Sequence, residues 1–156
     1  MQGNIKFVRF FLLFPVLLIM GCLSLCSCGN GNEDQLTETV SSFSDSYFNW
    51  QYFRSVKYCT PDSKQWLSYM ASQVNESDVK ALRAQEEGAT VEIEDVDMLQ
   101  GDSVAKVRVI VCNYLNMDTI GVKGRMVDKA LFVIPARRNN GVWKVQLTAP
   151  LRAVKD

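Results

Sequence analysis

Histidine is missing from this chain of 156 residues. Its absence excludes the usual general base, the Ser-His and Cys-His pairs of nucleophilic enzymes, and most zinc sites. An excess of charge of either sign is missing too, because 17 basic residues balance 17 acidic ones. Binding to nucleic acid requires a clear basic excess. We therefore expect no nucleic-acid partner, no metal site and no cofactor.

An A-x-A cleavage site for a secretory signal peptide is also missing, because the first alanine in the chain is Ala71. The N-terminus nevertheless has the layout of an export signal. Lys6 and Arg9 precede an apolar run from Phe10 to Leu25, which is short for a membrane span of about 20 apolar residues. An export signal is the prediction, and an uncleaved N-terminal anchor is the alternative.

The end of the apolar run reads LCSCGN from residue 25 onward. It resembles a bacterial lipobox, in which an apolar residue stands three before the lipidated cysteine and a small residue directly before it. Cys28 is accordingly the predicted lipidation site, for acyl chains such as palmitate, and Cys22 is the runner-up. The S-C-G-N ending is similar to that of Bacteroidetes lipoproteins. This resemblance implies a protein of the cell envelope, lipid-anchored to the outer membrane on its periplasmic or surface side.

The segment boundaries follow from this assignment. Residues 1–27 are the predicted lipoprotein signal peptide, residues 28–35 a flexible polar tether, and residues 36–156 a single α+β domain. A domain of this size buries about two thirds of its unfolded surface, so it needs neither a metal nor disulfides to hold a core.

The first half of the domain has the spacing of amphipathic helices. Its apolar stripe consists of Val40, Phe43, Tyr47 and Trp50. Residues 50–53 interrupt the stripe, and further helices are expected from about Asp62 to Val74 and from Asp78 to Glu87, with Ser77 as an N-cap. The many aromatic residues in this half are interpreted as core between the helices and a sheet.

The second half of the domain alternates like β-strands. In its longest run, Ser103 to Leu115, the odd positions are mainly apolar, so one face is expected to be buried throughout. Asn113 is expected on this inward face. Further strands are expected at 90–99, 126–135 and 142–149. A change of phase at Asp95 predicts a bulge in the first of them.

N-terminal helices packed on a curved antiparallel sheet of four strands resemble the nuclear transport factor 2-like cone, over about Leu36 to Leu147. The resemblance rests on YFNWQYFRSVKYCTPDSKQWL (residues 47–67), on the long strand and on the closing GVWKV (residues 141–145). Ketosteroid isomerase, scytalone dehydratase and polyketide cyclases share this fold, as do small exported lipoproteins with no assigned activity. A cystatin-like arrangement, one helix on a sheet, is the close alternative.

Enzymes of this fold work inside the cone, so the resemblance implies a candidate pocket there. Its candidate lining residues are Tyr47, Trp50, Tyr69 and Asn113. Similarity to the isomerase would require an inward-facing carboxylate, whereas the alternation turns Glu92, Glu94 and Asp97 outward. A buried asparagine more often satisfies backbone groups than performs chemistry. We therefore assign no catalytic residue.

Cys59 and Cys112 are the thiols of the predicted mature domain. In an exported protein, such a pair suggests a disulfide. The alternation, however, places the two residues on different faces of the sheet, so the bridged and the free states are both kept as alternatives.

The outer face of the sheet is expected to carry Ile110 and Tyr114. Beside them we expect either Phe132 and Ile134 or Leu131 and Val133 from the next strand. A contiguous apolar patch implies a cover or a partner. Because proteins of the resembled fold commonly pair through this face, a homodimer interface is predicted here.

The expected function is that of a non-enzymatic module which binds a small apolar ligand or a partner protein of the envelope. The alternative is a small isomerase-, dehydratase- or cyclase-type enzyme that uses the cone pocket. The sequence leaves enzymatic activity undecided and favours binding.

Overall fold

Helices precede strands along the chain. The computed structural model describes residues 31–117 and 122–155. The helices are α1 (Gly31–Phe48), α2 (Tyr52–Ser55), α3 (Lys64–Ser72) and α4 (Glu76–Arg83), with 3₁₀ turns η1 (Val56–Tyr58) and η2 (Pro61–Ser63) between α2 and α3. The strands are β1 (Thr90–Leu99), β2 (Val104–Asn116), β3 (Arg125–Asn139) and β4 (Val142–Val145). They form one antiparallel sheet in the order β1-β2-β3-β4, so the predicted α+β fold class is confirmed.

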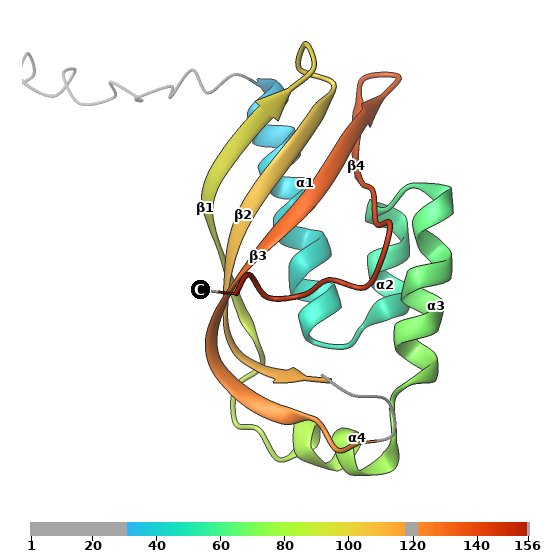
Figure 1. Ribbon diagram of the computed structural model, residues 1–156, viewed down its shortest axis with the longest axis vertical. Coiled ribbons are helices and arrows are strands. Elements are labelled where there is room, and N and C mark those ends of the chain that lie inside the picture. The colour runs from blue at the N-terminus through green and yellow to red at the C-terminus, as the bar shows by residue number, and fades with distance from the viewer. Residues whose placement is uncertain (1–30, 118–121, 156) are drawn as a thin grey trace, which may run out of the picture.

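The core lies between α1 and one face of the sheet, whose long strands bend around the helices (Figure 1). On β2, Val107, Val109 and Val111 are fully buried, as the alternation predicts. Burying each such side chain contributes roughly 1.5–3 kcal/mol relative to exposure. The residues of α1 in the same core are Leu36, Val40, Phe43, Tyr47 and Phe48.

The start of α1 differs from the prediction. Residues 31–35, which were assigned to the tether, form the first turns of this helix. Glu33 and Asp34 lie in the first turn, where carboxylates favour the positive end of the helix dipole. The indole Nε1 of Trp143 donates a hydrogen bond to Asn32 Oδ1 at 2.7 Å, which fixes this end of the helix to β4.

Two irregularities bend the sheet. The pairing of β1 with β2 shifts between Ile93 and Asp95, so the predicted bulge is confirmed. The second was not predicted: Asn113 has φ of 53° and no partner on β3, although the register of β2 with β3 is the same on both sides of it. Asparagine tolerates this left-handed conformation better than most residues.

The prediction that Asn113 faces inward is therefore wrong. Its side chain is exposed, and its Nδ2 donates to the carbonyl oxygen of Glu87 at 2.8 Å. The strict alternation of β2 ends at Asn113: Tyr114 is buried against the aromatic core, and the next residue, Leu115, is buried as well. The prediction that Tyr114 lies on the outer face is wrong for the same reason.

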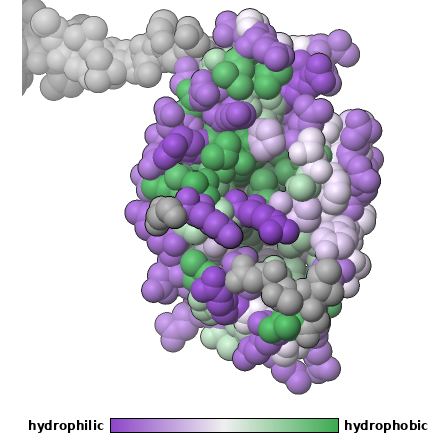
Figure 2. Space-filling view, in the orientation of Figure 1, coloured by the Kyte–Doolittle hydropathy of each residue, from purple (hydrophilic) through white to green (hydrophobic). Residues whose placement is uncertain are grey.

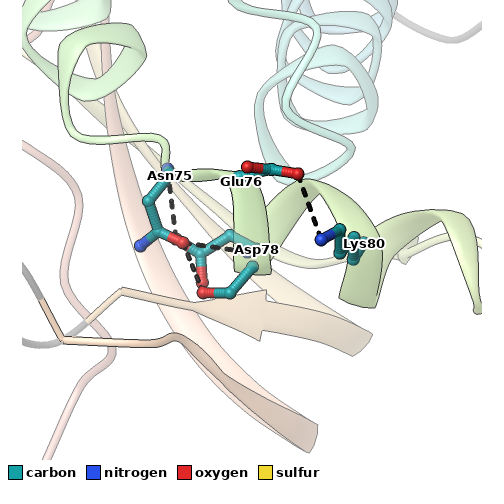
Figure 3. A network of polar contacts seen from close by, with 5 residues as sticks. Asn75, Glu76, Asp78 and Lys80 are labelled. Atoms are coloured by element: carbon teal, nitrogen blue, oxygen red, sulfur yellow. Dashed lines mark hydrogen bonds and ion pairs between the residues drawn. The ribbon is translucent and has the colours of Figure 1, made fainter.

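Helix α4 begins two residues before its predicted start, with Asn75 and not Ser77 as its N-cap. Asn75 Oδ1 accepts from the Asp78 N–H at 3.0 Å, and Asp78 Oδ2 accepts from the Asn75 N–H at 3.4 Å, which forms a capping box (Figure 3). Asp78 Oδ1 also accepts from the N–H of Gly124 at 2.8 Å. This fully buried carboxylate therefore joins α4 to the connection between β2 and β3.

After β4 the chain leaves the regular sheet earlier than predicted. The N–H of Gln146 still bonds to Pro135, and the N–H of Leu147 then donates to Ser63 Oγ at 2.8 Å. Further on, the N–H of Val154 donates to the carbonyl oxygen of Leu131 at 2.8 Å, so the last segment runs beside β3. Within the described residues, no helix combines the length and apolar character needed to cross a membrane.

Candidate functional site

The interior of the cone, where the pocket was expected, is occupied by packed aromatic rings. Phe48 and Phe132 have ring centroids 4.6 Å apart. Tyr114 packs edge-on against both, at 5.6 Å from Phe48 and 5.5 Å from Phe132. Each of these side chains is at most 5% exposed. Tyr114 turns inward directly after Asn113. Its ring therefore helps to fill this space.

The four candidate pocket residues lie in different places in the structure. Tyr47 is buried and Trp50 half-buried, and the two are neighbours at the end of α1. Tyr69 lies on α3 with 38% of its surface exposed. Asn113 lies where the alternation of β2 ends, and its side chain contacts the segment after α4. The structure therefore brings two of the four residues together and leaves the others on the surface.

The buried phenols are unsuited to act as bases. Burial raises the pKa of Tyr47 to about 12. The Leu151 main chain approaches the hydroxyl and offsets part of this rise, although it is not placed for a hydrogen bond of ordinary geometry. Burial, and then the neighbouring Tyr47, raise the pKa of Tyr52 further. Both hydroxyls therefore stay protonated at neutral pH.

Carboxylates are also lacking in the interior. Among the described residues, Asp78 is the one fully buried acid, and its two oxygens accept hydrogen bonds from the backbone of Asn75 and Gly124. Glu92, Glu94 and Asp97 on β1 are exposed. No group of three or more His, Cys, Asp or Glu residues that could hold a metal ion occurs in the described parts of the chain.

Cys59 and Cys112 are both free, so the alternative of a disulfide between them is wrong. Cys59 is buried at the edge of the sheet next to Val145 of β4, whereas Cys112 lies on β2, on the far side of β3. Burial raises the pKa of the Cys59 thiol to about 12, partly offset by the charge of Lys144. Cys59 is thus an unreactive core residue.

Of the two apolar sets predicted for the outer sheet face, the structure places Leu131 and Val133 there. Ile110 pairs with Leu131, and Val133 follows two residues on, 36% exposed. Exposed charges surround this patch, and Arg108 Nε lies 2.9 Å from Glu94 Oε2. Figure 2 shows hydrophobic side chains gathered over the strands between hydrophilic ones.

The most exposed large apolar side chain among the described residues is Phe53 on α2, at 93%. A groove of about 590 Å³ separates it from α1 and η1, and a second of about 450 Å³ from the end of α3. Gln51, Phe53 and Arg54 line both grooves. We call these three residues the Phe53 ridge. Sequence reasoning missed this ridge, although residues 50–53 crowd three aromatic side chains into a break of the helical stripe.

The ridge is held in place by its neighbours in the sequence. Trp50 adopts φ of 59° and donates from Nε1 to the carbonyl oxygen of Leu115 at 3.3 Å. The Gln51 N–H donates to Ser46 at 2.8 Å. Tyr52 and Ser55 point into the core and are buried. The short helix is thus anchored on one side and presents Phe53 on the other.

Cations stand beside the ridge. Arg54 Nη1 donates to Gln51 Oε1 at 2.8 Å, which keeps the guanidinium on the ridge. Lys57 Nζ lies 4.7 Å from the ring centre of Tyr58, and Lys144 Nζ donates to the Lys57 carbonyl oxygen at 2.6 Å. The pKa of the Tyr58 hydroxyl is lowered, mainly by its interaction with Lys57. The surface is therefore aromatic and positively charged.

Comparison with known proteins gives matches to solved structures, and those described here have TM-scores below 0.5. No family model and no curated protein matches the sequence. A Mycobacterium tuberculosis protein of unknown function matches with a TM-score of 0.48 and 9% identity, covering 83% of this chain and 78% of its own. The TraE protein in complex with 2-(2-furyl)isonicotinic acid matches with a TM-score of 0.45 and 13% identity, over 82% and 97%. A nuclear transport factor 2-like protein involved in plasmid conjugation matches with a TM-score of 0.36 and 12% identity, over 80% and 50%. The structural neighbours of this chain thus include nuclear transport factor 2-like proteins.

Proposed function

We propose that this chain is a non-enzymatic protein-interaction module, held at the outer membrane by acyl chains on Cys28. The observation that carries the proposal is the filled cone. Phe48, Tyr114 and Phe132 pack where an enzyme of this fold would open its pocket. Binding is thereby left to the outer surfaces, where the Phe53 ridge and the apolar patch of Ile110, Leu131 and Val133 lie.

The chemistry of the interior also supports a role without catalysis. The inward side chains of β2 and β3 are apolar, and the phenols of Tyr47 and Tyr52 are kept neutral by burial. An isomerase or cyclase needs a group that exchanges protons near neutral pH. Within the described residues, the buried acid Asp78 serves instead as a helix cap.

The anchor is proposed from the sequence, since Cys28 lies outside the described residues. The lipobox-like LCSC ends two residues before Asn30, and α1 begins at Gly31. If Cys28 is lipidated, only a few residues separate the acyl chains from the domain. Two or more acyl chains anchor a protein stably. The domain would therefore work close to the membrane surface.

The test is native mass spectrometry of the full chain, extracted in detergent from the cells that make it. We expect the mass of an acylated chain that begins at Cys28, in complexes with protein and without a retained small molecule. A Cys28→Ser variant should leave the membrane fraction and serves as the control. A small apolar molecule that stays bound after desalting would overturn the proposal in favour of a ligand carrier.

A further inference from the structure

We infer that the Phe53 ridge is a docking surface for an acidic peptide segment of a partner protein, with an apolar side chain as its anchor. This inference rests on the proposed function and specifies its partner. It starts from Phe53, which is 93% exposed although the chain has a large core in which a phenylalanine could be buried. Burial of such a side chain by a partner would remove a large apolar area from water, which favours binding.

The ridge is ordered before any partner arrives. The N–H groups of Arg54 and Ser55 both bond to the Gln51 carbonyl oxygen, at 2.8 and 3.2 Å, and Tyr52 is buried beneath them. An aromatic side chain on a fixed support loses little conformational entropy on binding. This arrangement is typical of the residues that dominate interface energies.

Backbone strain occurs at the same place. Trp50, directly before the ridge, has φ of 59°. This conformation is unusual for a bulky residue and unfavourable for its backbone. The hydrogen bond from Trp50 to Leu115 and the burial of Tyr52 hold the strained turn. Such strain is often found at functional positions, so the strained turn directly before the ridge supports the inference.

The charges indicate what binds. Arg54 and Lys57 line the larger groove, and in the described part of the chain neither has an ion-pair partner. Lys144 adds a third cation beside Lys57. Asp45 is the carboxylate of this groove, and it accepts a hydrogen bond from Asn49 Nδ2 at 3.3 Å. The excess of positive charge is complementary to carboxylates that flank an apolar anchor.

The same features disfavour the other occupants. A two-fold contact pairs the same patch of both copies. Two copies of this chain meeting ridge to ridge would therefore bring Arg54 and Lys57 of one copy near the same cations of the other. A membrane is disfavoured by position. The proposed anchor precedes Gly31, and α1 with its 18 residues spans about 27 Å before the chain reaches α2. Figure 1 shows the start of α1 near one end of the molecule and α2 beside the other end of this helix.

The test is photocrosslinking with the full chain in the cells that make it, using Phe53→p-benzoylphenylalanine as the probe. The same photoreactive residue at Val142, which is 45% exposed on β4, is the matched control. We expect an adduct from position 53 whose crosslinked peptide, mapped by mass spectrometry, belongs to another protein and contains more acidic than basic residues. Adding Arg54→Glu and Lys57→Glu should reduce its yield about tenfold, which corresponds to about 1.4 kcal/mol. The Lys80→Glu variant changes an exposed side chain on α4 and should leave the crosslinking yield unchanged.

Several results would overturn the inference: an adduct to phospholipid, to a second copy of this chain, or to a basic peptide, or a yield no higher than from position 142. An adduct to a second copy would leave the proposed function standing. If position 53 and the same probe at Ile110 both gave no protein adduct, the proposed function would fail as well. Thermal unfolding of each variant shows that the domain still folds.

Discussion

Asn113 is the residue at which the regular alternation of β2 ends. Its left-handed backbone leaves it unpaired and turns Tyr114 from the outer face into the aromatic core. A β-branched residue cannot adopt this conformation without strain, whereas glycine adopts it freely. The consequences of a change at position 113 therefore depend on the backbone and on the amide group separately.

We expect Asn113→Val to lower the free energy of unfolding by about 2–4 kcal/mol, because strain adds to the loss of the bond to Glu87. Asn113→Gly loses that bond and keeps the conformation, so it should cost about 1 kcal/mol. Denaturant unfolding of both variants measures the difference. Equal losses of stability in both variants would mean that the side-chain hydrogen bond of Asn113, and not its backbone conformation, maintains this part of the strand.

The thiol of Cys59 makes stability depend on alkaline pH. Burial raises its pKa from 9.0 to about 12, so the folded state keeps a proton that the unfolded chain releases. The stability contribution is complete below pH 9 and is lost as the pH rises toward 12. In Cys59→Ala, the free energy of unfolding should therefore fall less steeply above pH 9 than in the wild type. Identical slopes would show that the buried tyrosines alone cause the decline.

At the scale of elements, the carboxylate of Asp78 joins α4 to the connection between β2 and β3. Asp78 caps its own helix through Asn75 and also binds Gly124, beyond β2 (Figure 3). On the same helix, Glu76 forms an ion pair with Lys80 at 3.0 Å in which both side chains are at least 75% exposed. Exposed pairs of this kind contribute little to stability.

This contrast supplies a matched pair of variants. Asp78→Ala should lower the free energy of unfolding by about 2–3 kcal/mol, because it removes the cap and leaves the Gly124 N–H unpaired. Glu76→Ala should cost at most about 0.5 kcal/mol. Hydrogen exchange should show loss of protection at Gly124 in the first variant alone. Equal protection in both variants would contradict a joining role for Asp78.

At the scale of the whole molecule, the outer sheet face is the surface we propose for a second copy. Ile110 and Leu131 are half-buried and Val133 is 36% exposed, so the patch is only partly covered by the surrounding charged side chains. A sheet face with such a patch is a common contact between copies. The Phe53 ridge lies on α2, away from the strands, so both surfaces can be used together (Figure 1).

Ile110→Asp should convert a dimer into a monomer, because it places a charge in the centre of the patch. Val142→Asp, at the exposed hairpin of β3 and β4, is the control and should remain dimeric. Analytical ultracentrifugation of the full chain in detergent measures both. A monomeric wild-type chain would refute the predicted homodimer and leave the Phe53 ridge as the principal contact surface.

The sequence by itself determined the order of helices and strands, the α+β class and which side chains of β2 face the core. Each depends on side-chain periodicity over several residues, which is a property of the local chain. Val107, Val109 and Val111 could thus be assigned to the core, and the phase shift at Asp95 to a bulge.

Only the tertiary structure decided the candidate sites. Asn113 donates its amide to Glu87, which is distant in sequence, and Tyr114 directly after it turns into the core. Cys59 is kept from Cys112 by the strands that lie between them. Phe53 is exposed because Tyr52 beside it occupies the core. Periodicity cannot reveal such outcomes, since each depends on contacts between segments far apart in the chain.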